Sequence, residues 1–333
     1  MAKPIKDTEY LYASARIKSI EKNLLSRERL ERMIDARSLE DALKLLSESG
    51  WPEITDYTMP AVESVLSDRR SEAFALIRSL APDGKLADIF LVKYDYHNLK
   101  TLLKSELTGE NPDDLVIDNG IFPCRQLKVM LQENHFAAMG ERMAESVAEA
   151  RDVLARTQDP QLLDLILDKA MYADMLDLAT AFGSAFLENY IILSIDSANL
   201  RTVVRLQRMG KGSEILRHAL IPGGSVSVSR LLGDITADVI EGAFGASSLA
   251  AAAAAGAGAL RGENSLASLD LACDNTLLKY LKAAKYVAFG AEPLIGYILA
   301  IEAELISVRT VISGRLAGLA ADMISERLRE TYV

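Results

Sequence analysis

Apolar residues recur along the chain at the spacing of one face of a helix. Within residues 39–46, leucine and alanine occupy positions i, i+3, i+4 and i+7, and Ser38 stands where a helix N-cap is expected. Alternating strand patterns bounded by turn residues are scarce, and the nearest case, residues 223–228, is more easily explained as the approach to a helix. The pattern predicts an all-α protein.

Composition supports this prediction, because 50% of residues are apolar, only 6% are aromatic and there are 9 prolines. The net charge of -10 repels phosphate backbones and anionic lipid surfaces, so we expect neither nucleic acid nor direct lipid binding and look for protein partners. Cys124 and Cys273 lie far apart, and we recognise no secretory signal at the start of the chain. A reducing, cytosolic compartment is expected.

The longest uncharged stretch of the sequence, residues 242–260, is long enough to span a bilayer. It consists mostly of alanine and glycine, with only Phe244, Leu249 and Leu260 as large apolar side chains. We therefore predict either a closely packed helix or a mobile linker there.

Two sequence patterns repeat three times in step. Residues 95–104 align without gaps to residues 196–205, and a weaker third copy begins at Glu304. The shared pattern is acid-x-x-(Asn/Ser)-aliphatic-basic-Thr-aliphatic-aliphatic. The second pattern is a helix-starting residue followed by apolar residues four and eight positions later: Ser26, Leu30 and Ile34; Pro123, Leu127 and Leu131; Ser227, Leu231 and Ile235. Their joint repetition indicates a triplicated unit.

The triplication divides the chain into three predicted helical domains, residues 1–115, 116–215 and 216–333. Glycine-containing hinges are expected near residues 109–112 and 210–212. Repeated helical units either stack as a solenoid or close around an axis. Three units suit closure better, but the repeat alone leaves both arrangements open.

The repeated motif supplies the only candidate site. Its acid, amide and basic positions are Asp95, Asn98, Lys100, Asp196, Asn199, Arg201, Glu304 and Arg309, with Ser307 at the amide position of the third copy. These groups either satisfy one another and neighbouring helix ends, or they orient the domains around a shared axis or face a partner. Lys100 with Lys104 is a like-charged i, i+4 pair, as is Arg201 with Arg205, so acidic partners are expected.

If the basic positions orient the domains, charge reversal at Lys100, Arg201 and Arg309 should weaken assembly more than reversal at Arg69 and Arg70. The last two arginines are expected to be exposed and serve as the control.

Catalytic motifs are not found in the sequence. Residues 210–213 fail as a phosphate loop, because Arg205 and Gly212 stand where the pattern requires glycine and a hydroxyl residue. The histidines are too far apart to suggest a metal site, and an ordinary packed or surface role is expected for His97. We therefore predict no catalytic residues, no metal and no cofactor.

Several motifs resemble those of the C subunits of the archaeal and bacterial V-type (A-type) rotary ATPases. The N-terminal motifs lie at residues 10–17, 24–28 and 38–43, the middle ones at 95–104 and 196–205, and the C-terminal ones at 292–297 and 302–316. The resemblance covers nearly the whole chain. The motifs are weak individually, but their order and spacing agree.

This resemblance implies a funnel-like protein of three similar helical domains about a pseudo-threefold axis. In that family, which is related to the eukaryotic d subunit, the protein is a non-catalytic part of the central stalk. It links the D and F subunits of the shaft to the proteolipid rotor ring at the cytoplasmic face of the membrane, and so couples ATP turnover to H⁺ or Na⁺ transport. The alternatives are a free-standing helical scaffold with an unrelated protein partner and, with less support, a helical enzyme.

Overall fold

The computed structural model describes residues 6–82 and 84–333, and every regular element in them is helical. The all-α prediction is therefore confirmed for these residues, while residues 1–5 and 83 of the first predicted domain lie outside them. Within the described ranges, no helix combines the length and apolar character needed to cross a membrane. The chain forms two compact units, whose described parts are Lys85–Ala243 and residues 6–82, 84 and Phe244–Val333.

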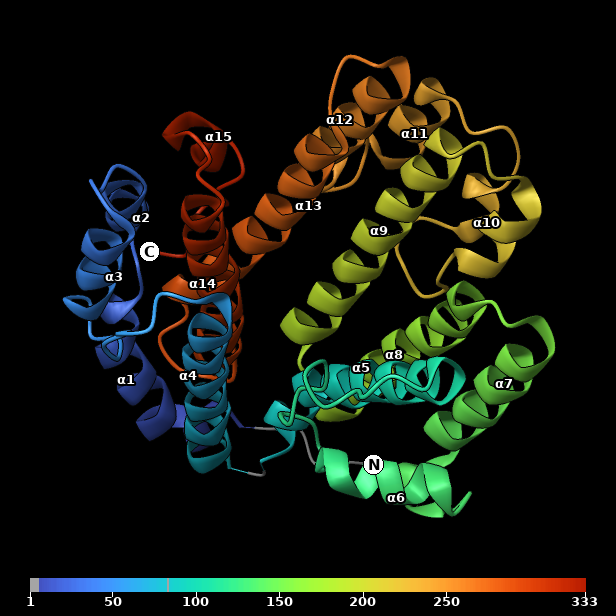
Figure 1. The fold of residues 1–333 in the computed structure, drawn as a ribbon, viewed down its shortest axis with the longest axis horizontal. Coiled ribbons are helices and arrows are strands. Elements are labelled where there is room, and N and C mark those ends of the chain that lie inside the picture. Colours follow the sequence, from blue (N-terminus) through green and yellow to red (C-terminus); the bar gives the residue numbers. More distant parts are fainter. Residues whose placement is uncertain (1–5, 83) are drawn as a thin grey trace. The chain divides into compact units, whose positions relative to one another are not determined.

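The first unit is built around the long helix α8 (Pro160–Phe182), which packs against α5, α7 and α9 (Figure 1). The other elements of this unit are α5 (Lys85–Thr108), α6 (Cys124–Gln132), η3 (Ala137–Met139), α7 (Glu141–Thr157), α9 (Ala185–Arg208), α10 (Ser213–Ala219), η4 (Val228–Leu231) and α11 (Ala237–Phe244), the last of which ends at the unit boundary. Asp159 caps α8 by accepting the Gln161 N–H at 2.8 Å, and Gly183, with φ at +81°, ends the helix.

The second unit is built around α14 (Glu292–Leu316), which contacts α1, α2, α3, α4, α13 and α15. Its other elements are η1 (Asp7–Tyr10), α1 (Leu11–Ile20), η2 (Glu21–Asn23), α2 (Arg27–Ile34), α3 (Leu39–Ser47), α4 (Met59–Leu80), α12 (Ala250–Arg261), α13 (Leu266–Leu281), η5 (Lys282–Tyr286) and α15 (Ala321–Ser325). Residues 293–301 of α14 are all buried, as their nearly unbroken apolar run requires. Helices from both ends of the sequence thus share one core.

The predicted apolar stripes are confirmed. Ala42, Leu43 and Leu46 are buried on α3, and the Ser38 hydroxyl accepts the Asp41 N–H at 3.0 Å as its N-cap. The apolar positions of the repeated motif are also buried: Leu99, Leu102 and Leu103 on α5, and Leu200, Val203 and Val204 on α9.

The uncharged stretch, residues 242–260, comprises the end of α11, a turn and most of α12, and α12 packs against α13. Space is tight at the C-terminal end of α12, where a Cβ on Gly258 would stand 2.3 Å from Nδ2 of Asn264 in the loop that leads to α13. Of the two structures predicted for this stretch, the packed helix is the one observed over residues 250–260. By contrast, the helix start predicted at Ser227 leads only into the short 3-10 helix η4, and Gly233 soon follows with φ at +110°.

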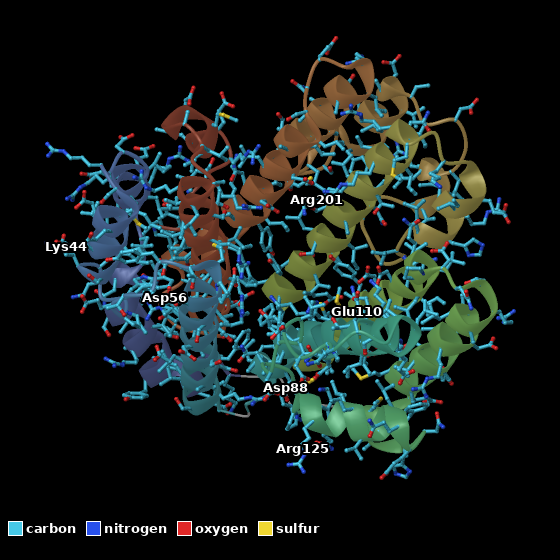
Figure 2. All side chains as sticks on the ribbon, in the orientation of Figure 1. Lys44, Asp56, Asp88, Glu110, Arg125 and Arg201 are labelled. Carbon is cyan, nitrogen blue, oxygen red and sulfur yellow. The ribbon has the colours of Figure 1, made fainter. Side chains whose placement is uncertain are left out.

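The expectation that Arg69 and Arg70 are exposed is wrong. Arg70 is buried and its Nε donates to Glu302 at 3.1 Å, while the Arg69 guanidinium lies 5.4 Å from the Trp51 ring centre. Both partners, Glu302 and Trp51, lie outside α4, the helix that carries the two arginines. The apolar pattern of that helix alone therefore could not reveal these contacts. Lys44 on α3 and Arg125 on α6 are exposed instead (Figure 2).

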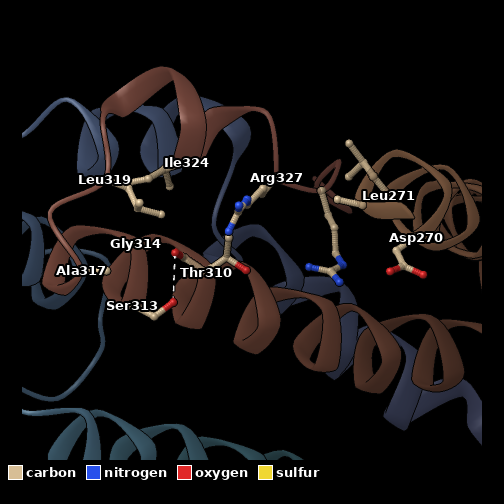
Figure 3. A pocket seen from close by; sticks show the side chains of 11 residues that line it. Asp270, Leu271, Thr310, Ser313, Gly314, Ala317, Leu319, Ile324 and Arg327 are labelled. Atoms are coloured by element: carbon tan, nitrogen blue, oxygen red, sulfur yellow. Dashed lines mark hydrogen bonds between the residues drawn. The ribbon is translucent and has the colours of Figure 1, made fainter. Parts of the chain in front are cut away.

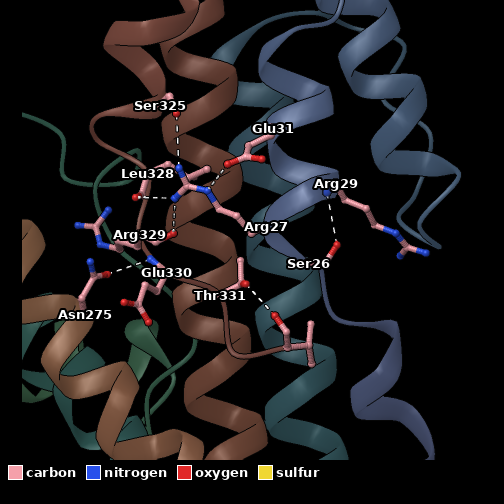
Figure 4. A network of polar contacts seen from close by, with 11 residues as sticks. Ser26, Arg27, Arg29, Glu31, Asn275, Ser325, Leu328, Arg329, Glu330 and Thr331 are labelled. Carbon is pink, nitrogen blue, oxygen red and sulfur yellow. Dashed lines mark hydrogen bonds and ion pairs between the residues drawn. The ribbon is translucent and has the colours of Figure 1, made fainter.

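The C-terminal tail is fastened to the start of the chain. Arg27 of α2 donates to the Leu328 and Arg329 carbonyls at 3.1 and 3.4 Å and pairs with Glu31 at 2.7 Å (Figure 4). Further along the tail, Tyr332 is buried. The tail therefore covers part of the junction between α2 and α14.

Candidate functional site

The acid of the first motif is buried on α5 and binds the backbone ahead of the next helix. Asp95 Oδ2 accepts the Ile121 N–H at 3.0 Å, and its Oδ1 accepts the Phe122 N–H at 3.0 Å. Phe122 directly precedes Pro123, the N-cap of α6. The Asp95 carboxylate thus fixes the segment that leads into α6.

The acid of the second motif makes the same contacts from α9. Asp196 Oδ2 accepts the Ser225 N–H at 3.0 Å and the Ser225 hydroxyl at 2.5 Å, and its Oδ1 accepts the Val226 N–H at 3.1 Å. Val226 directly precedes Ser227, the N-cap of η4. Two successive backbone N–H groups are therefore bound in the same order as on α5.

The amides of both motifs fasten a second point on the same segments. Asn98 exchanges two hydrogen bonds of 2.8 Å with the backbone of Ile117, and Asn199 does the same with Ile221, also at 2.8 Å. In both motifs the same number of residues separates the point bound by the amide from the point bound by the acid. We call this acid–amide arrangement the clip.

Each of these two clips needs a glycine against its carboxylate. A Cβ added to Gly120 would lie 2.1 Å from Asp95 Oδ1, and one added to Gly224 would lie 2.2 Å from Asp196 Oδ1. No side chain fits at either distance. These glycines stand three positions before the helix-starting residues Pro123 and Ser227, so extending the second repeated pattern upstream would have found them.

The third clip joins α14 to the beginning of the chain. Glu304 Oε2 accepts the Leu25 N–H at 2.5 Å, and Leu25 directly precedes Ser26, the N-cap of α2. Ser307, at the amide position, donates instead to the Ala303 carbonyl of its own helix at 3.0 Å. The third clip therefore retains the contact of the acid without that of the amide.

The segment just before the helix start, which we call the lead-in, also differs in the third clip. Asn23 stands where the other two clips have glycine, and the glutamate side chain is one methylene longer than aspartate. The Leu24 N–H is taken by the Glu21 carbonyl at 3.1 Å, within the turn that ends η2. One N–H therefore remains for the Glu304 carboxyl group.

The clips follow a cyclic order. The acid on the motif helix of the first copy binds the backbone just before the second copy's helix start. The acid of the second copy binds the third copy in the same way, and the acid of the third copy binds the first. All three contacts lie inside one or other of the two compact units.

The basic residues of the first motif bind acids of the following copy. Lys100 Nζ lies 2.7 Å from Asp168 Oδ1, and Lys104 Nζ lies 2.6 Å from Asp164 Oδ1, both on α8. The like-charged pair on α5 is thus offset by an acidic pair inside the same unit. Because these side chains are partly exposed, each ion pair contributes only about 0.2–1 kcal/mol.

Arg309 of the third motif binds Glu63 of α4 through two parallel hydrogen bonds, at 2.5 Å from Nε and 2.6 Å from Nη2. Arg201 of the second motif is half-buried on α9 (Figure 2). A role of the motif in orienting domains around an axis or in facing a partner protein stays a prediction.

Burial sets the electrostatics of the third clip. Desolvation raises the pKa of Glu304 to about 7, and the hydrogen bond from Leu25 and the positive charges of Arg69 and Arg29 offset only part of this rise. Burial also raises the pKa of Tyr332 in the neighbouring tail. The third clip thus holds a carboxyl group that titrates near neutrality.

A cavity of about 510 Å³ lies beside the third motif, lined by α13, α14, α15 and the tail (Figure 3). Its lining combines Leu271 and Ile324 with Asp270 and Arg327.

Other candidate chemistry is absent or already engaged in the described part of the chain. No group of three or more His, Cys, Asp or Glu side chains there has a geometry that would hold a metal. His97 Nε2 lies 3.0 Å from the Leu115 carbonyl, and Cys124 and Cys273 are buried free thiols. The clips are therefore the principal polar arrangement, and their chemistry is that of anchoring backbone.

Comparison with known proteins agrees with the motifs. The C subunit of the V-type sodium ATPase of Enterococcus hirae is 25% identical over 325 residues, which cover 97% of this chain and 99% of the relative. The C subunit of the V-type ATP synthase of Thermus thermophilus is 25% identical over 328 residues, which cover 96% of this chain and 98% of the relative. The C subunit of the A-type ATP synthase of Methanocaldococcus jannaschii is 24% identical over 342 residues, which cover 96% of this chain and 86% of the relative.

The family description "ATP synthase (C/AC39) subunit" matches residues 13–327, which include all three clips. Because this match spans nearly the whole chain, the protein belongs to the ATP synthase (C/AC39) subunit family.

Proposed function

We propose that this chain is a non-catalytic central-stalk subunit of a V/A-type rotary ATPase or ATP synthase. The observation that carries the proposal is the family match over residues 13–327, together with relatives of nearly equal length that are named as the C subunits of such complexes. The protein links the D and F subunits of the shaft to the proteolipid rotor ring, on the cytoplasmic side of the membrane. ATP turnover and H⁺ or Na⁺ transport are carried out by other subunits.

The proposed architecture is three similar helical domains, residues 1–115, 116–215 and 216–333, in a funnel about a pseudo-threefold axis. The cyclic order of the clips supports it, because each copy is fastened to the next by the same backbone contact. Such fastening suits a protein that transmits torque, since a buried carboxylate bound to backbone N–H groups resists displacement. The residues Asp95, Asn98, Lys100, Asp196, Asn199, Arg201, Glu304 and Arg309 act in this proposal by orienting the helical units.

Deletion of the chain in its native organism tests the proposal. Without it, isolated catalytic heads should still hydrolyse ATP, whereas membrane vesicles should lose ATP-driven ion uptake. Undiminished uptake would contradict the proposal. Co-purification separates it from a free-standing scaffold: a rotor protein is recovered with the ring and the shaft, and a scaffold with neither.

A further inference from the structure

The third clip differs chemically from the other two in how its carboxyl group is satisfied. Asp95 and Asp196 each accept two backbone N–H groups, whereas Glu304 accepts only that of Leu25. Two donors stabilise the negative charge of a carboxylate far better than one does. The carboxyl group of Glu304 therefore has one backbone donor where each of the two equivalent aspartates has two.

The second oxygen of Glu304 is buried beside a small cavity. Among the described residues no hydrogen-bond partner reaches its Oε1 atom, which is buried. Glu304 lines a cavity of about 10 Å³, room for roughly one water molecule, together with Ser307, Thr331 and Tyr332. The hydroxyl protons of Ser307 and Thr331 are already given to the carbonyls of Ala303 and Val333, at 3.0 and 2.8 Å.

Charged groups on the surrounding elements do not neutralise this carboxyl group. Arg69 of α4 and Arg29 of α2 favour its ionised form from a distance, and no hydrogen bond joins either side chain to it within the described residues. Glu330 of the tail lines the same cavity, and Tyr297 lies within electrostatic range on α14. Burial outweighs these influences and favours the neutral acid.

We propose that the contact between Glu304 and Leu25 is a proton-controlled latch: the buried carboxyl group binds a proton when the latch is closed, and loss of that proton loosens the join between α14 and the start of α2. The ligand of this site is a proton. The latch does not depend on the proposed function, because it involves only contacts inside one compact unit.

The position of the latch gives its opening a defined consequence. The Glu304–Leu25 bond joins segments 279 residues apart, and the C-terminal tail covers it. Opening there would release the lead-in of α2 and the tail residues packed on it, while the clips of Asp95 and Asp196 stay closed. The effect of pH is therefore local and has two internal controls in the same chain.

Amide hydrogen exchange in the full-length protein tests the latch at single-residue resolution. After correction for intrinsic exchange, protection of the Leu25 amide should fall by about tenfold or more between pH 6 and pH 8, since one pH unit past the midpoint changes the ratio of the two forms tenfold. The Phe122 and Val226 amides should show no comparable change. Equal behaviour of the three amides would overturn the proposal.

Two variants sharpen the test. Glu304→Gln, which cannot ionise, should make protection of Leu25 independent of pH. Asp196→Asn should change the exchange protection of the Val226 amide and leave the pH dependence of Leu25 protection intact. If Glu304→Gln does not fold, a carboxyl-selective ¹³C titration of the wild-type protein decides instead: a midpoint near 7 for Glu304 supports the latch, and one near 4.5 contradicts it.

Discussion

The backbone N–H of Leu25 donates to Glu304 Oε2 at 2.5 Å, across 279 residues of sequence. The same relationship joins Phe122 to Asp95 and Val226 to Asp196. The helix that ends one copy of the repeat thus binds the start of the next, and the last copy binds the first. This order explains why the two ends of the chain share one compact unit.

Alanine at Gly120 or Gly224 should destabilise the protein strongly. The new Cβ would lie 2.1 or 2.2 Å from an aspartate oxygen, so either the carboxylate or the lead-in must move and the clip hydrogen bonds are strained. We expect a loss of about 2–4 kcal/mol in the free energy of unfolding, measured with urea. Gly242→Ala is the matched control, because it lies in a helix with open space around it, and it should be neutral or stabilising by about 0.5–1 kcal/mol. Similar losses in all three variants would contradict the role given to the two glycines.

Removal of the Asn199 amide should cost about 2–4 kcal/mol, because Asn199→Ala leaves both the N–H and the carbonyl of buried Ile221 without their partners. Asn199→Asp should also destabilise, since aspartate can accept from the N–H but offers the carbonyl no donor. Thermal unfolding provides the measurement, and Gln132→Ala at the exposed end of α6 should stay within about 0.5 kcal/mol of wild type. A neutral Asn199→Ala would show that the amide is dispensable.

Stability should depend on pH through Glu304. Its pKa rises from 4.5 to about 7 on folding, so between these values the folded state binds more protons than the unfolded state and stability falls as pH increases. The resulting decrease in the free energy of unfolding is absent below about pH 4.5 and grows between about pH 4.5 and pH 7. Above about pH 7 it is complete and amounts to about 3 kcal/mol. The difference in unfolding free energy between wild type and Glu304→Gln, followed from pH 4.5 to 8, isolates this contribution. A difference that does not change with pH would rule it out.

Charge exchange between α5 and α8 should be tolerated better than single reversals. In the wild type the Lys100 and Asp168 side chains lie 2.7 Å apart. Lys100→Asp alone places two acids together, whereas Lys100→Asp with Asp168→Lys restores a pair of opposite charges. Because the pair is partly exposed, we expect a loss of about 1 kcal/mol for the single variant and recovery of most of it in the double variant. Additive losses in the double-mutant cycle would mean that the two residues do not interact.

Charge reversal at Lys100, Arg201 and Arg309 together tests their role in assembly, but Arg69 and Arg70 are unsuitable controls because of their contacts with Trp51 and Glu302. Reversal of the exposed Lys44 and Arg125 is the better control. We expect the triple reversal to reduce recovery with the ring and the shaft more than the control does, in a folded sample verified by circular dichroism.

The helical class, the repeat and the buried stripes could be predicted from the sequence, because apolar periodicity reports directly which helix face is buried. The acids and amides of the clips are also visible in it, but their partners are not. Those partners are backbone N–H groups, which carry no residue-specific signal. Each of them also lies in the copy that follows the one carrying the acid. Gly120 and Gly224 are easily missed although their positions match, since neither belongs to the helix that carries the acid.

The proposed coupling role is tested most directly by adding the purified chain back to membranes from which it has been removed. Stripped membranes recombined with catalytic heads and shaft should hydrolyse ATP without accumulating H⁺ or Na⁺ in vesicles, and the wild-type chain should restore ion uptake. We predict restoration by the wild type and much less by Gly224→Ala. Full ion uptake before the chain is added would contradict the coupling role.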